Sequence, residues 1–152
     1  MENQAVKPPM VLIVESDPLM LTGLAAILDK KGYRCFLART VEIAEQATQS
    51  IAFDLIVYSF ATDPIGAAQA VSKLRTTEQM LDCPVLFLAD AYDPKWIEPL
   101  NLAGGVYCLP KPFEPEMFLE LVDKTFCLPH LAAAKVAPPK PHFSKDWVRL
   151  SY

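Results

Sequence analysis

Five short apolar runs recur along the chain, and each is separated from the next by a stretch whose apolar residues have helical spacing. The runs cover residues 11–14, 33–38, 54–60, 84–89 and 105–109. Strands that are buried on both faces are nearly continuous in apolar residues. Strands that alternate with helices form a parallel sheet through right-handed crossovers. The pattern therefore predicts a doubly wound α/β fold with five parallel strands and five flanking helices.

The helical stretches are expected over residues 19–31, 41–49, 65–79, 93–104 and 114–126. The fourth is unusual because Pro99 removes a backbone donor from its interior, so we expect a short or kinked helix. Such a remodelled helix leaves Trp96 free to project as an anchor for a partner protein. The alternative interpretation of Trp96 is half-buried packing on its own domain.

Charge is divided unevenly along the 152 residues. The last 24 carry four basic side chains against Asp146, a net charge of +3, and the chain as a whole carries −4. The preceding 128 residues must therefore carry −7, which argues against nucleic acid as a partner. No apolar stretch is long enough to span a membrane, so direct membrane insertion is not expected. The N-terminus lacks the features of a signal peptide, which predicts a cytoplasmic protein.

The sequence divides into an N-terminal extension (1–8), a folded domain (9–128) and a proline-rich basic tail (129–152). A tail of this length is too short for an output domain. Within its last ten residues, 143–152, three large apolar side chains share one stripe if the segment is helical: Phe143, Trp147 and Leu150. This amphipathic or extended segment is a candidate docking element, and its groove belongs either to a partner or to the chain's own acidic body.

Four quoted stretches carry a resemblance to a known family over residues 9–128: "VLIVESDP" (11–18), "FDLIVYSF" (53–60), "PVLFLADA" (84–91) and "AGGVYCLPKPF" (103–113). In this order and spacing they resemble the receiver domain of two-component response regulators. The resemblance implies a flavodoxin-like sheet with strand order 2-1-3-4-5. It also implies that polar residues gather at the carboxyl ends of the strands.

The chemistry that the family performs is phosphoryl transfer to an aspartate, assisted by Mg²⁺, a hydroxyl side chain and a lysine. By position, Ser59 stands in place of the acceptor aspartate, Ser16 in place of a metal-binding carboxylate, and Ala89 in place of the hydroxyl. Only Glu15 and Lys111 match the family's pattern. A serine alcohol is un-ionised at neutral pH, and no base is placed to activate it.

The pocket formed by Glu15, Ser16, Ser59, Ala89 and Lys111 is therefore predicted to be degenerate, with no metal, no cofactor and no catalysis. Glu15 and Lys111 are expected to form an internal ion pair. Asp17, Asp63 and Asp90 could assemble a displaced metal site, but we interpret them as loop or capping residues.

The main hypothesis is a pseudo-receiver that acts through protein–protein interaction without phosphorylation. Two alternatives remain: a single-domain relay with an unorthodox acceptor, and a sensor that binds a small ligand in the vacated pocket. In the family, the fourth helix, fifth strand and fifth helix form the usual partner face, which also allows a homodimer here. Cys108 replaces an aromatic residue of that face. The candidate partner-binding residues are Trp96, Cys108, Phe143, Trp147 and Leu150.

Overall fold

The computed structural model describes residues 7–133 and 147–150 of the chain. Six strands form one sheet in the order β2-β1-β3-β4-β5-β6. The first five are parallel to one another, and β6 is antiparallel to β5. The strands are β1 (Met10–Val14), β2 (Arg34–Ala38), β3 (Leu55–Phe60), β4 (Val85–Ala89), β5 (Gly105–Pro110) and β6 (Val148–Arg149). The predicted flavodoxin-like order 2-1-3-4-5 is confirmed, with one strand added to it.

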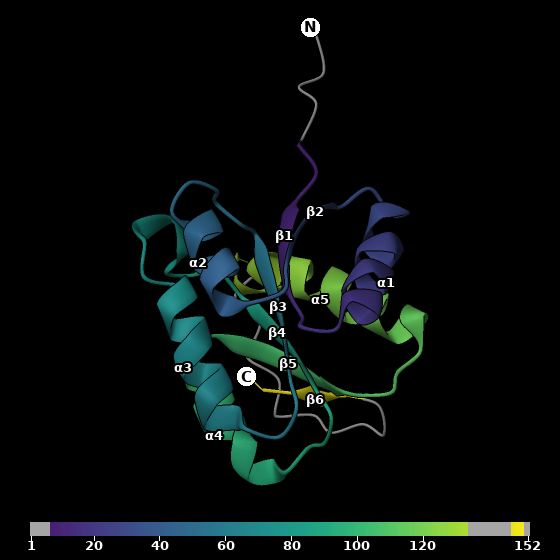
Figure 1. Cartoon of the computed structure of the whole chain (residues 1–152), viewed down its shortest axis with the longest axis vertical. Helices are drawn as coiled ribbons and strands as arrows, with labels where there is room; N and C mark the ends of the chain where they lie inside the picture. The colour runs from purple at the N-terminus through teal and green to yellow at the C-terminus, as the bar shows by residue number, and fades with distance from the viewer. Residues whose placement is uncertain (1–6, 134–146, 151–152) are drawn as a thin grey trace, which may run out of the picture.

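Helices cover both faces of the sheet, as Figure 1 shows: α2, α3 and α4 lie on one side, α1 and α5 on the other. Each face has its own apolar cluster, and strand residues alternate between the two. Leu12 and Ile56, for example, pack on one side, while Val11 and Leu55 pack on the other. The helices are α1 (Pro18–Asp29), α2 (Val41–Thr48), α3 (Pro64–Leu74), α4 (Ile97–Leu102) and α5 (Pro115–Ala133), with the 3₁₀ turns η1 (Glu78–Met80) and η2 (Pro94–Trp96).

The helix starts follow local capping chemistry. The carboxylates of Asp17 and Asp63 accept hydrogen bonds from the first turns of α1 and α3, with a proline next in each case. These side chains satisfy backbone donors that have no partner inside a helix. The interpretation of Asp17 and Asp63 as capping residues is therefore confirmed.

Two helix lengths differ from expectation. The third helix was expected to extend to residue 79 but ends at Leu74. The guanidinium of the next residue, Arg75, donates to the carbonyls of Ala103 and Leu81, so its side chain satisfies backbone acceptors outside the helix. The fifth continues to Ala133, beyond the predicted domain boundary at residue 128. The fourth has only six residues after η2, so the predicted short helix around Pro99 is confirmed.

Of the two conformations open to the tail, an amphipathic helix or an extended segment, the structure shows the extended one for the residues that it describes. Residues 148–149 form β6, and Val148 and Leu150 point to the α4 side while Trp147 packs on the α5 side. Trp147 and Leu150 therefore lie on opposite faces of the sheet, because side chains alternate along a strand. Phe143 lies outside the described residues. Of the two grooves considered, residues 147–150 occupy one on their own domain.

Leu150 is 2% exposed, and its environment predicts a measurable contribution to stability. Leu150→Ala should lower the free energy of unfolding by about 2 kcal/mol, at the low end for buried leucines because a terminal segment relaxes easily. Urea unfolding followed by circular dichroism measures this difference. Leu102→Ala is the matched control, since Leu102 is 76% exposed; its change should stay within about 0.5 kcal/mol. Equal effects of the two substitutions would contradict the burial of Leu150.

Candidate functional site

The residues of the predicted pocket meet at the carboxyl edge of the sheet. Glu15 follows β1, Ser59 lies near the end of β3, Ala89 ends β4, and Lys111 follows β5. Parallel pairing aligns these strand ends, with Ser59 opposite Leu88 and Ala89 opposite Pro110. The backbone amide of Lys111 donates to the carbonyl of Ala89 at 2.7 Å, which joins the last two strands at this edge. Ser16 is exposed in the turn before α1.

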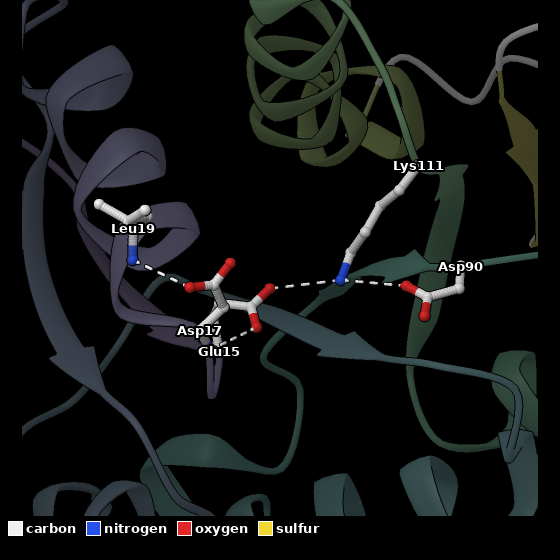
Figure 2. A network of polar contacts seen from close by, with 5 residues as sticks. All are labelled: Glu15, Asp17, Leu19, Asp90 and Lys111. Carbon is white, nitrogen blue, oxygen red and sulfur yellow. Dashed lines mark hydrogen bonds and ion pairs between the residues drawn. The ribbon is translucent and has the colours of Figure 1, made fainter.

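Glu15 is the central charge of the site. Its side chain is only 5% exposed and has two partners. Oε2 accepts a hydrogen bond from the amide of Asp17 at 3.0 Å, and Oε1 lies 3.3 Å from the ammonium of Lys111. Figure 2 shows Lys111 reaching across the edge to this carboxylate. The predicted ion pair between Glu15 and Lys111 is therefore confirmed.

Lys111 also contacts a second carboxylate. Its ammonium lies 3.5 Å from Oδ1 of Asp90, so it sits between two acidic groups, as Figure 2 shows. The Lys111 side chain is 18% exposed and that of Asp90 is 56% exposed. The contact with Asp90 is therefore screened by solvent more than the contact with Glu15. The interpretation of Asp90 as a plain loop residue missed this role.

Opposing effects set the pKa of Glu15. Burial raises the pKa, but the hydrogen bond from Asp17, the hydroxyl of Ser59 and the charge of Lys111 together lower it below its ordinary value. The Ser59 hydroxyl is close enough to contribute, yet its buried oxygen makes no hydrogen bond of good geometry among the described residues. The carboxylate form of Glu15 is thus the stable form at neutral pH.

Trp96 and Cys108 are both packed against apolar residues. Trp96 is half-buried, with its ring 5.7 Å from that of Phe60 and 6.2 Å from that of Tyr92. Half-buried packing, the alternative considered for Trp96, describes this arrangement. Cys108 is fully buried, and burial raises the pKa of its thiol to about 12, so the thiol stays protonated.

Comparison with known proteins identifies the family. A sequence-family model described as the response regulator receiver domain matches residues 11–123, most of the chain. The chain belongs to the receiver family. Transcriptional regulatory protein BasR of Escherichia coli is 29% identical to this receiver domain over 106 residues, which are 70% of the chain and 47% of BasR. The probable transcriptional regulator ycf29 of Porphyra purpurea is 27% identical over 113 residues, 74% of the chain and 54% of that protein. The chain thus spans about half the length of these relatives.

Solved structures show the same fold. Chemotaxis protein CheY4 of Vibrio cholerae has a TM-score of 0.70 and 24% identity, over 77% of this chain and 98% of its own. A response regulator from Thermotoga maritima has a TM-score of 0.69 and 23% identity, over 77% and 96%. The receiver domain of the histidine kinase PA1611 from Pseudomonas aeruginosa, solved with magnesium in its active-site cleft, has a TM-score of 0.62 and 22% identity, over 77% and 96%.

The donor set of this receiver domain does not fit Mg²⁺. Magnesium prefers several hard oxygen ligands in octahedral geometry. Here one buried carboxylate, Glu15, is already held by an amide and an ammonium. Ser16 and Ser59 carry hydroxyls rather than carboxylates, and the Lys111 cation lies between the two nearest acidic groups. Within residues 7–133 and 147–150, no three metal-ligating side chains gather as a metal site.

The described part of the chain also contains no helix that is both long and apolar enough to cross a membrane.

The ion pair predicts a pH-dependent stability. The pKa of Glu15 is lower in the folded chain than its ordinary value of 4.5, so its contribution is fully present above that value and is lost as pH falls through the folded pKa. Glu15→Gln should lower the free energy of unfolding by about 1 kcal/mol at pH 7, with the difference shrinking below about pH 4. Urea unfolding across this pH range measures it.

The matched control is Glu120→Gln, because Glu120 pairs with Lys124 at 3.3 Å on the exposed surface of α5. This substitution should change stability by less than about 0.5 kcal/mol at every pH. A difference between Glu15→Gln and the unsubstituted chain that grows as the pH falls would contradict the assigned direction of the shift.

The poor fit to magnesium predicts no stabilisation by that ion. A ligand stabilises a fold only when its concentration approaches or exceeds its dissociation constant. Addition of millimolar MgCl₂ should therefore leave the melting temperature unchanged, relative to NaCl at the same ionic strength. A magnesium-specific rise in melting temperature would show that Asp17 or Asp90 has rebuilt a cation site beside Glu15.

Proposed function

We propose that this receiver domain acts as a phosphorylation-independent protein-binding module, a pseudo-receiver. The observation that supports it best is the position of Lys111, which bridges Glu15 and Asp90 at the edge where the family holds magnesium and the phosphoryl group. Ser16 and Ser59 carry hydroxyls where the family's pattern has carboxylates, so the carboxylates beside this ammonium do not rebuild the family's phosphoryl-transfer site. Receiver domains act in signalling through contacts with other proteins, and a receiver without phosphoryl chemistry retains that capacity.

The alternative of an unorthodox phosphorylation relay is less well supported. Phosphoryl transfer depends on positioned positive charge that stabilises the developing charge of the transition state. In this chain Ser59 is an un-ionised alcohol, and the neighbouring carboxylate of Glu15 is already bound by Lys111. Ala89 offers no hydroxyl to a phosphoryl oxygen. Use of the pocket for a small ligand stays a prediction, as do the homodimer and a cytoplasmic location.

Phosphorylation can be tested directly by incubation with acetyl phosphate and MgCl₂, followed by intact-mass measurement. The unsubstituted chain should gain no phosphoryl group. Ser59→Asp should also remain unmodified or react very slowly, because the side chains at Ser16 and Ala89 still supply neither a metal ligand nor a hydroxyl.

Ser59→Asn is the matched control, since it has the size of the aspartate variant without a nucleophilic carboxylate. A conventional receiver domain in parallel shows that the donor is active. Rapid gain of one phosphoryl group by the unsubstituted chain would overturn the proposed function and favour the relay. Rapid gain by Ser59→Asp alone would show that the remaining pocket is still competent.

A further inference from the structure

The outer edge of β5 is covered by the chain's own tail. In the parallel part of the sheet β5 is the last strand, and an uncovered last strand presents unpaired backbone groups that invite another strand. β6 pairs with this edge in antiparallel register, Tyr107 with Arg149 and Cys108 with Val148. The amide of Leu150 donates to the carbonyl of Val106 at 2.6 Å. Figure 1 shows β6 alongside β5 at the margin of the sheet.

On the α4 side of the sheet, small residues of β5 form the surface against which the tail packs. This surface is called the seat of the tail. A Cβ atom at Gly105 would lie 2.6 Å from the carbonyl oxygen of Leu100, 2.7 Å from Cε2 of Phe87 and 2.8 Å from Cδ1 of Leu150. The glycine therefore leaves room both for the backbone of α4 and for this leucine. Cys108 stands directly opposite Val148, which is 4% exposed. The seat therefore selects two aliphatic side chains at alternating positions of an extended segment.

On the α5 side the seat selects an aromatic residue. The ring of Trp147 packs edge-on against Tyr107, with centroids 5.3 Å apart. The ammonium of Lys124 lies 4.8 Å from the centroid of the Trp147 ring, a cation–π distance. Together, the two sides of this edge accommodate an aromatic residue at position 147 and aliphatic residues one and three positions later.

The tail does not fill the whole site. A groove of about 420 Å³ continues past Leu150 between this side chain and the η2–α4 segment, lined by Lys95, Ile97, Glu98 and Asn101 among others. The ladder between β5 and β6 is only two residues long. A longer extended segment would add both backbone pairing and groove contacts, so it can compete with the tail for the same edge.

We propose that the β5 edge is a docking site for an extended segment of a partner protein, with an aromatic residue followed at alternating positions by two aliphatic residues. Residues 147–150 occupy this site in cis and act as a built-in competitor. The inference deepens the proposed function and rests on it, because it names the surface and the kind of partner through which a receiver without phosphoryl chemistry acts.

A labelled synthetic peptide with the sequence of residues 143–152 is a suitable probe, titrated by fluorescence anisotropy against two full-length chains. It should bind the Trp147→Ala/Leu150→Ala chain at least about 10-fold more tightly than the unsubstituted chain. The reason is that a tethered competitor acts at an effective concentration in the millimolar range until it is weakened. The Leu102→Ala chain should behave as the unsubstituted one. A peptide with aspartate in place of the valine and leucine should bind neither.

Equal peptide affinity for the two chains, or equal binding of the aspartate peptide, would overturn the proposal. If the double variant does not fold, hydrogen exchange on the unsubstituted chain gives a second measurement. Exchange at the Leu150 amide should rise as unlabelled peptide is added, and unchanged exchange at saturating peptide would overturn the proposal. A dimer of the unsubstituted chain that dissociates with excess peptide would assign the edge to a second copy instead. These titrations contain no phosphodonor, so the mass measurement tests the proposed function separately.

Discussion

Charge compensation of Glu15 is the constraint on which the carboxyl edge of the sheet depends. A carboxylate that is almost fully buried needs an opposite charge and hydrogen-bond donors to remain ionised. Lys111 and the amide of Asp17 supply these, and the same ammonium reaches Asp90. Lys111 occupies the position of the family's lysine, and its ammonium lies 3.3 Å from Glu15 and 3.5 Å from Asp90. The edge keeps the family's architecture, and its buried carboxylate is compensated by a neighbouring side chain and a backbone amide.

Strand β5 links this edge to the tail. Gly105 lies beside both Leu100 and Leu150, and Cys108 pairs with Val148 of the tail. Lys111, just after the strand, pairs with Glu15. In the η2 segment beside it, the ring of Trp96 contacts Phe60 at a tilt and Tyr92 edge-on. The small side chain of Cys108 lies opposite Val148, where the sixth strand joins the sheet. The outer margin of the sheet is thus built partly from the chain's own tail.

The sequence was sufficient to predict the parallel sheet and the ion pair, because both follow from position. Nearly continuous apolar runs define the strands, and Glu15 and Lys111 each follow one, so topology brings them together. For Trp147 and Leu150 the sequence left two conformations open, an amphipathic helix and an extended segment. Their spacing suits a helix, but the unpaired edge of β5, about 40 residues earlier, favours a strand. Tertiary context overrides local periodicity in so short a segment. The contact between Asp90 and Lys111 was not predicted, because it depends on a residue distant in the sequence and not on the residues next to Asp90.

The position of β6 in the chain has a consequence for synthesis. Translation proceeds at roughly 5–20 residues per second, so about 2–8 seconds separate the emergence of Cys108 from that of its strand partner Val148. During this interval the five parallel strands can pair while the outer edge of β5 stays bare. Bare strand edges are where nascent chains pair with one another. The tail thus covers the edge of β5 only after the rest of the domain has been synthesised. Slower translation of the segment between β5 and β6 lengthens the time for which this edge is exposed.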